Sequence, residues 1–361
     1  MLVLVRGVGD VGSAVAHRLF GAGYGVVIHD DPEPTTSRRG MAFTDAVFDG
    51  HAVLEGVRAV CIDDLEQVKR AVVAHEVIPV SVRPLAPLLA GLQPQVLVDA
   101  RMRKHAGPEI HSGLADFTIA LGPSLVVGRH ADVVIETSWE DLGRVITTGA
   151  SLPLGGEPRA IDGHARDRYV YAPIDGVFRT TFRIGDAVRQ GQEVAHIDST
   201  ALAAPLDGVL RGLTRDAVPV TVRTKVIEID PRGRAGGVRG IAERPRRIAD
   251  GVLTAITDRS KSPSNSLTPL SGTETLRKAP RRSGFEKVRS NYSRKVVVEG
   301  EGVVGPCPLI LRYFDSTTRQ NAAERDIPRN QTQPVFRPRK ETRPAPAPES
   351  PRPLSACRAH A

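Results

Sequence analysis

The chain contains an internal repeat that constrains its fold more than any other feature. Residues 172–198 align with residues 204–230 without a gap, and 11 of the 27 positions are identical, beginning with APIDGV and APLDGV. Each copy predicts a strand, a tight turn at Asp-Gly and two further strands, because glycine tolerates positive φ and aspartate can bond its own backbone. Neither copy could bury its apolar side chains alone. The repeat therefore predicts a small all-β domain over residues 165–232.

The spacing inside this domain resembles the biotinyl/lipoyl family of barrel-sandwich domains. An Ala-Pro…Gly start is followed by GDAVRQGQEV at residues 185–194, as in that family. In its carrier proteins, a lysine on the hairpin between the two halves holds the prosthetic group. Here that hairpin is HIDSTALAAP at residues 196–205, and it has no lysine. The resemblance therefore implies a small lipoyl-like barrel sandwich with neither biotin nor lipoate attached.

Before the repeat, short apolar runs alternate with helical patterns. The apolar runs include residues 2–5, 25–30, 57–62, 78–82, 96–101, 117–121 and 132–137. Runs this apolar are typical of strands buried on both faces of a parallel sheet. We therefore predict an α/β fold over residues 1–150, a Rossmann-like domain with a doubly wound parallel sheet, and a further helix over residues 240–258.

A glycine-rich motif, GVGDVG, lies between the first predicted strand and the first predicted helix. It places Gly7, Gly9 and Gly12 in the spacing of a dinucleotide-binding loop, and Asp30 ends the next strand. In such loops the first glycine makes the turn, the second lets a phosphate approach and the third allows close helix packing, while an acidic residue binds a ribose hydroxyl. Asp10 departs from the pattern, because it puts a carboxylate where phosphates should approach. The alternative interpretation is a glycine turn that serves packing only.

Asp99 and Arg101 end another predicted strand, at the edge where open α/β sheets bind ligands. They are candidate ligand-binding residues, or they pair with each other or cap the following loop. His17 on the first helix has no second histidine or cysteine nearby, so we predict no metal site.

Taken in order, the motifs of residues 1–258 resemble the accessory proteins of selenium-dependent molybdenum hydroxylase systems, the YqeB family. The resemblance rests on the start LVLVRGVGDVGSAVAHRL, the run EPTTSRRGMAFTDAVFDG at residues 33–50, and the shorter motifs VDARM, LGPS, VIET and DLGRVI. The chain departs from the family at Ser124, where LGPG becomes LGPS. It departs again at residues 248–256, where IADGVLTAI replaces a GGGVLEAI type of helix start.

The resemblance implies a role in maturing a molybdenum hydroxylase, by handling its cofactor or by delivering selenium or sulfur to it. It implies hydroxylase subunits as partners and the molybdenum cofactor, as molybdopterin or its dinucleotide, as ligand. Arg38 and Arg39 lie in the matching run. They are candidate cofactor-binding residues, because the cofactor carries a phosphate or pyrophosphate and arginine matches phosphate geometry. The alternative is a solvated pair on a loop.

An NAD(P)-dependent oxidoreductase that uses the glycine loop and Asp30 is the alternative function. Against it, no His–Asp or Tyr–Lys arrangement that would supply a general acid or base is evident in the first domain. A scaffold that binds no ligand is the third interpretation. The sequence leaves open whether any reaction is catalysed and what the oligomeric state is.

The positive net charge of +8 is concentrated near the C-terminus. Residues 1–258 hold 29 Lys and Arg against 32 Asp and Glu, whereas residues 259–361 hold 20 against 9, with 13 of the 28 prolines. This composition predicts a disordered basic tail over 259–361. Its charges are scattered among prolines without interleaved aromatics, so no nucleic-acid partner is expected. Without an apolar run of membrane length or a CxxC pair, we expect no membrane contact and a cytoplasmic location.

Overall fold

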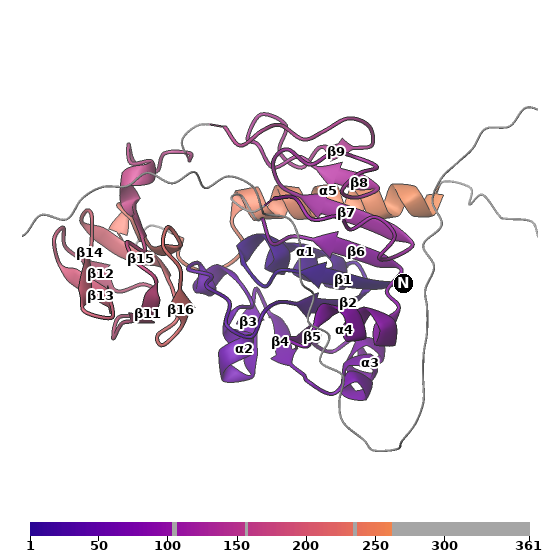
Figure 1. Cartoon of the computed structure of the whole chain (residues 1–361), viewed down its shortest axis with the longest axis horizontal. Helices are drawn as coiled ribbons and strands as arrows, with labels where there is room; N and C mark the ends of the chain where they lie inside the picture. The colour runs from indigo at the N-terminus through magenta and orange to yellow at the C-terminus, as the bar shows by residue number, and fades with distance from the viewer. Residues whose placement is uncertain (103–106, 156–157, 234–236, 262–361) are drawn as a thin grey trace, which may run out of the picture. The chain divides into compact units, whose positions relative to one another are not determined.

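The apolar runs of the first 146 residues form one nine-stranded sheet (Figure 1). The computed structural model describes residues 1–102, 107–155, 158–233 and 237–261. The strand order across the sheet is β3-β4-β5-β2-β1-β6-β7-β8-β9. The strands are β1 (Leu2–Arg6), β2 (Gly25–His29), β3 (His51–Leu54), β4 (Val57–Cys61), β5 (Ile78–Ser81), β6 (Val96–Asp99), β7 (Phe117–Leu121), β8 (Val133–Ile135) and β9 (Val145–Ile146).

Helices pack on both faces of the central strands, and the period of two along β1 explains how. Val3 and Val5 point into a core shared with α1 and α5, whereas Leu4 points into a second core shared with α3 and α4. The helices are α1 (Asp10–Gly21), α2 (Asp45–Asp49), α3 (Leu65–Ala74), α4 (Leu85–Leu92) and α5 (Glu243–Lys261), with short 3-10 turns η1 (Arg39–Met41) and η2 (Arg166–Arg168). β1 is therefore packed on both faces, and its carboxyl end leads into α1.

The predicted Rossmann-like doubly wound parallel sheet is wrong, because the sheet is mixed. Its middle strands are parallel, but both edges are antiparallel pairs, β3 with β4 and β8 with β9. The alternation of strand and helix also stops after β6, since the described residues between β6 and β9 contain no helix. The segment after β7 contains Gly122, Pro123 and Gly128, the segment after β8 contains Gly143, and neither forms a helix.

The repeat forms two four-stranded antiparallel sheets. Their orders are β10-β17-β15-β12 and β14-β13-β11-β16, so strands of one copy pair with strands of the other. The strands are β10 (Tyr169–Tyr171), β11 (Gly176–Arg179), β12 (Ala187–Val188), β13 (Glu193–Ile197), β14 (Thr200–Ala203), β15 (Gly208–Leu213), β16 (Pro219–Val220) and β17 (Lys225–Asp230). Register shifts interrupt the pairing of β10 with β17, β13 with β14 and β15 with β17.

The predicted lipoyl-like barrel sandwich is therefore also wrong. The repeat builds two separate, interrupted sheets, and the strand pairings do not close them into a barrel. The repeated glycines have a different role from the predicted turn. Gly176 and Gly208 have φ of +156° and +154°, and a Cβ at either would overlap Asp198 or Asp230, the aspartates that end the two copies. Close contact between strands thus explains why these positions repeat.

The predicted disordered tail lies outside the described residues, apart from its first three positions, which end α5. A helix was predicted over residues 240–258, and α5 spans Glu243–Lys261. In the described part of the chain, no helix is both long and apolar enough to cross a membrane.

Gly251 lies in the segment 248–256, where the sequence departs from the family pattern, and α5 packs closely through it. A Cβ at Gly251 would overlap the carbonyl oxygen of Gly143, which precedes β9. Asp250, beside it, pairs with Arg18 of α1 at 2.7 Å. One glycine in the middle of α5 is thus enough for the contact, while its neighbour Asp250 makes an ion pair.

We expect Gly251→Ala to lower the free energy of unfolding by about 1–3 kcal/mol, because overpacking against a backbone carbonyl forces the helix to shift. Urea unfolding followed by circular dichroism measures this change. The matched control is Gly21→Ala at the end of α1, where a Cβ would meet nothing within 4 Å. Equal effects of the two substitutions would show that α5 does not pack through Gly251.

Candidate functional site

The glycine loop joins β1 to α1, and two of its three glycines are required by packing alone. Gly7 has φ of +112°, and a Cβ there would lie 3.0 Å from the backbone of Ala100. A Cβ at Gly12 would overlap the carbonyl oxygen of Gly7. These glycines therefore allow the turn and the close approach of α1, whether or not a ligand is bound.

Gly9 is different, because neither its conformation nor its neighbours require a glycine. It is the N-cap of α1, with φ of −69° and ψ of −178°, and no side chain caps the helix there. A Cβ would meet only Thr36, at 3.5 Å. Of the three loop glycines, Gly9 is thus the one whose missing side chain leaves open space at the N-terminus of α1, where backbone N–H groups favour an anion.

Asp30 binds the glycine loop itself. Its carboxylate accepts hydrogen bonds from the N–H groups of Val8 at 2.6 Å and Asp31 at 2.8 Å. Burial raises the pKa of Asp30 despite these bonds. Both carboxylate oxygens are therefore occupied by backbone, and a ribose hydroxyl would have to share them.

Asp10 occupies the position that an anion would take at this helix. Its carboxylate accepts a hydrogen bond from the N–H of Val11 at 3.1 Å and another from Arg38 Nη1 at 2.9 Å. Burial alone would raise the pKa of Asp10, but the positive charges of Arg38 and Lys225 outweigh it and hold that pKa below its usual value. The sequence departure at Asp10 thus places a negative charge among cations.

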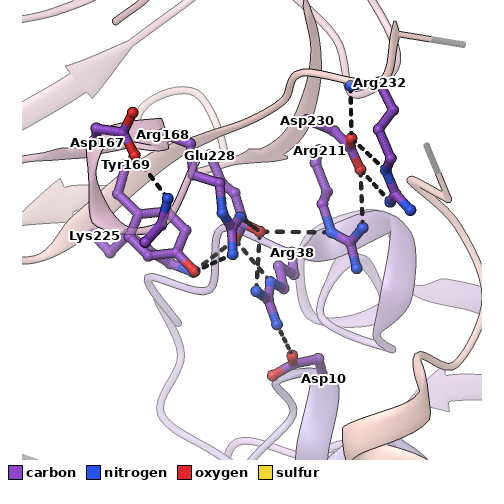
Figure 2. A network of polar contacts seen from close by, with 11 residues as sticks. Asp10, Arg38, Asp167, Arg168, Tyr169, Arg211, Lys225, Glu228, Asp230 and Arg232 are labelled. Atoms are coloured by element: carbon purple, nitrogen blue, oxygen red, sulfur yellow. Dashed lines mark hydrogen bonds and ion pairs between the residues drawn. The ribbon is translucent and has the colours of Figure 1, made fainter. Parts of the chain in front are cut away.

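Arg38 connects the glycine loop to the repeat (Figure 2). Its Nε and Nη2 donate to the two carboxylate oxygens of Glu228 on β17, at 2.8 and 2.9 Å, while Nη1 donates to Asp10. This is the fork geometry that makes arginine–carboxylate pairs strong and directional. The two sequence segments that the fork joins are therefore held in one orientation.

Glu228 lies at the centre of the cations that gather here, and its side chain is fully buried. Arg168 donates to it at 2.5 Å and Lys225 at 2.8 Å, and Arg211 lies 3.5 Å away. Burial alone would raise the pKa of Glu228, but these cations and Arg38 hold it well below the usual range. The carboxylate stays charged because it is surrounded by partners.

We call this group the Glu228 cluster. It also includes Asp230, which accepts hydrogen bonds from Arg211 at 3.1 Å and Arg232 at 2.7 Å. Its members are Asp10, Arg38, Arg168, Arg211, Lys225, Glu228, Asp230 and Arg232 (Figure 2). Five cations thus face three carboxylates.

The members of the Glu228 cluster carry five positive charges against three negative ones. Burial lowers the pKa of Lys225, and the charge of Arg38 lowers it further, although Glu228 acts in the opposite direction. The buried Nε of Arg168 has no hydrogen-bond partner in the described structure, and that of Arg211 lies 3.5 Å from Glu228. The outer edge of the cluster is open to solvent, since the side chains of Asp10, Arg38 and Lys225 are 24%, 21% and 28% exposed. The cluster therefore suits an added anion.

Arg39, the other arginine of the predicted pair, points elsewhere. Its Nη1 donates to Asp45 at 2.6 Å, and its Nε donates to the carbonyl of Leu213 on β15 at 2.9 Å. The structure therefore does not bring Arg38 and Arg39 to one site.

Asp99 and Arg101 pair with each other at the carboxyl end of β6. Arg101 Nε and Nη2 donate to the two carboxylate oxygens of Asp99, at 2.8 and 2.9 Å. Arg101 also contacts Glu109 at 2.7 Å, and hydrogen bonds from Arg101 and Arg6 lower the pKa of Glu109 to about 2. The alternative interpretation of a mutual pair therefore matches the geometry.

Two arrangements that the sequence did not reveal are present in three dimensions. His111 Nε2 lies 2.6 Å from Asp99, which forms a His–Asp pair with a histidine only 2% exposed. Lys225 Nζ lies over the ring of Tyr169, 4.6 Å from its centre. Neither pair carries a sequence motif. For Glu228 the one signal was a polar residue inside the apolar strand pattern of KVIEID.

No protein-family model matches the chain. Over 259 residues the sequence is 38% identical to the uncharacterized protein YqeB of Escherichia coli (strain K12), and the match covers 71% of this chain and 47% of YqeB. The chain thus spans about half the length of this curated relative.

Two solved structures are more distantly similar. The ectoine utilization protein EutE (DoeB) from Ruegeria pomeroyi is 14% identical, with 63% of this chain and 84% of that chain covered at a TM-score of 0.19. A succinylglutamate desuccinylase from Silicibacter sp. TM1040 gives 14% identity, 63% and 84% coverage and a TM-score of 0.20. At these TM-scores neither structure informs the chemistry of this chain.

We expect Glu228→Gln to lower the free energy of unfolding by about 3–5 kcal/mol, because it leaves buried cations without their counter-charge. Chemical unfolding at neutral pH measures the loss. Asp216→Asn is the control, since Asp216 pairs with Arg179 at 3.6 Å in an exposed position, and such pairs contribute little. A loss no larger than in the control would contradict the central position of Glu228.

The depressed pKa of Glu228 also predicts a loss of stability in acid. The folded pKa lies well below the ordinary 4.5, so the stabilisation by Glu228 is fully present above that pH and is lost as pH falls toward the folded pKa. We expect the free energy of unfolding to decline from about pH 5 downward, with a smaller decline in Glu228→Gln than in wild type. Parallel pH curves for the two proteins would rule this contribution out.

Proposed function

We propose that this YqeB-like chain is an accessory protein that helps to mature a selenium-dependent molybdenum hydroxylase, and that it binds a phosphate-bearing ligand such as the molybdenum cofactor. The role in maturation and the hydroxylase partner come from the family resemblance. The observation that carries the binding site is the excess of cations in the Glu228 cluster, beside the N-terminus of α1. The ligand would bind there through its phosphate.

The geometry favours a phosphate over a neutral ligand for two reasons. The N-terminus of a helix attracts anions through its N–H groups and its partial positive charge. Gly9 leaves this end of α1 without a side chain, Arg38 donates to Asp10 beside it, and the charge of Lys225 also acts on Asp10. A phosphate would therefore meet backbone donors and two cations at once.

Asp10 acts as an internal competitor in this proposal. Its single negative charge now satisfies Arg38 Nη1 and one N–H of α1. A phosphate group carries more charge and more acceptor oxygens than a carboxylate, so it can replace Asp10 on Arg38. Binding would thus move the Asp10 side chain outward.

The Glu228 cluster fits the phosphate end of the molybdenum cofactor. Gly9 provides the open backbone, and Arg38 and Lys225, each partly exposed, provide the cations. Within the described ranges no three His, Cys, Asp or Glu residues are grouped to hold a metal ion. We therefore assign these residues to the phosphate alone. The hydroxylation chemistry of the bound cofactor would belong to the partner enzyme.

An NAD(P)-dependent oxidoreductase has less support, because both carboxylate oxygens of Asp30 already accept backbone hydrogen bonds, one from Val8 in the glycine loop and one from Asp31. The His111–Asp99 pair is a possible acid–base arrangement. His111 is buried, and Asp99 also forms an ion pair with Arg101.

We test the site with calorimetric titration of molybdopterin dinucleotide, NAD and pyrophosphate. Gly9→Val should abolish binding of the phosphate-bearing ligand, because its side chain fills the space at the helix N-terminus while its backbone conformation remains ordinary. Asp10→Asn should tighten binding by roughly fivefold to tenfold, or about 1–1.4 kcal/mol, since it removes the competing charge. Folding of each variant is checked by circular dichroism. Unchanged binding in a folded Gly9→Val protein would exclude this site.

The role in maturation has its own test. When a selenium-dependent molybdenum hydroxylase is produced with this chain, its molybdenum content and activity should be higher than without the chain. Gly9→Val should reduce that gain, whereas Gly21→Ala should preserve it. A hydroxylase that is fully loaded in the absence of the chain would contradict the proposed role.

A further inference from the structure

A second cationic site lies apart from the Glu228 cluster and shares no residue with it. It is a pocket of about 380 Å³ between the segment around η1 and the turn that follows β11. The pocket is lined by Arg39, Gly40, Asp45, Thr180, Thr181, Phe182, Arg183, Ile184, Arg215, Asp216 and Arg239. Four arginines thus face two aspartates.

Two of the four arginines are already fixed by carboxylates. Arg39 donates to Asp45 at 2.6 Å, and Arg215 donates through both Nη atoms to Asp49, each at 2.6 Å. These pairs hold the guanidinium groups at the wall of the pocket and keep their orientation. The wall therefore exists before any ligand arrives.

The other two arginines, Arg183 and Arg239, are exposed and uncompensated. Within the described residues, neither guanidinium has a hydrogen bond or an ion pair. Arg183 follows β11 in sequence, and Arg239 comes from the segment that leads to α5. Asp216, the second aspartate of the lining, lies 3.6 Å from Arg179, which is outside the lining. Two cations from separate segments thus lie at one pocket without an ion pair, an arrangement that suits an anion.

The backbone brings Arg239 to this place. A Cβ at Gly40 would lie 2.6 Å from the carbonyl oxygen of Val238, and the N–H of Gly240 donates to the carbonyl of Gly40 at 3.2 Å. The absence of a side chain at Gly40 thus lets residues 238–240 lie against η1. Phe182 and Ile184 are partly buried and pack on the core of the repeat, so they provide a firm apolar wall.

We propose that this pocket binds a phosphorylated small organic molecule. Arginine forks match the geometry of phosphate oxygens, and two free forks can hold one phosphate or two linked ones. A volume of about 380 Å³ exceeds the needs of a lone phosphate and falls in the range of pockets for small organic ligands. The organic part would lie against Phe182 and Ile184. This site goes beyond the proposed function and does not depend on it.

The experiment uses the full chain carrying Gly9→Val, so that binding at the N-terminus of α1 is blocked. ADP, pyrophosphate and adenosine are titrated by calorimetry. We expect ADP to bind more tightly than pyrophosphate and adenosine not to bind. Adding R183Q and R239Q together should weaken ADP binding by about tenfold or more, because two charged contacts are lost.

Two further variants separate a real pocket from general charge attraction. Thr181→Trp keeps every charge but fills the pocket from an exposed position, and it should abolish ADP binding. Arg189→Gln removes an exposed arginine outside the pocket and should leave binding unchanged. The proposal is overturned if neither ADP nor pyrophosphate binds the Gly9→Val chain at ligand concentrations of about 1 mM, the upper end of the usual range of KM values. Binding that falls equally with Arg189→Gln would overturn it as well.

Discussion

The fork between Arg38 and Glu228 is the contact on which the arrangement of this site depends. It joins a loop after β2 to a strand 190 residues later in the chain, and the carboxylate it contacts is fully buried. Burying two charges is costly, and it is tolerated here because Arg168 and Lys225 also donate to Glu228. The fork therefore sets the glycine loop beside β17, whose Glu228 gathers the cations of the cluster.

This placement explains why a carboxylate is tolerated at Asp10. In a dinucleotide-binding loop a carboxylate at this point would repel phosphate, yet here it lies among Arg38 and Lys225 and compensates part of their charge. In the proposed function, the remaining positive charge and the open space at Gly9 make the site suitable for a phosphate. Asp10 by itself would disfavour phosphate at this loop, but Arg38 and Lys225, from other parts of the chain, offset its negative charge.

The sequence predicted local features better than their partners. The roles of Gly7 and Gly12 follow from spacing, because each requirement arises within one strand, turn and helix. The mixed sheet could not be predicted, since apolar runs such as β7 and β8 read alike in parallel and antiparallel sheets. The repeat predicted two matching sets of strands, but the register shifts within the two sheets leave no pattern in the sequence.

The candidate site shows the same difference between local features and distant partners. Arg38 could be chosen as an anion ligand from its motif, but its partner Glu228 could not, because no local pattern links residues so distant in sequence. His111 was missed for the same reason, since only the fold brings it to Asp99. The central claim is that a phosphate replaces the Asp10 carboxylate at the N-terminus of α1. A crystal structure of the chain with pyrophosphate tests it most directly. The claim predicts phosphate density between Gly9, Arg38 and Lys225, with Asp10 turned away from Arg38. A structure in which pyrophosphate is bound elsewhere and Asp10 keeps its bond to Arg38 would contradict it.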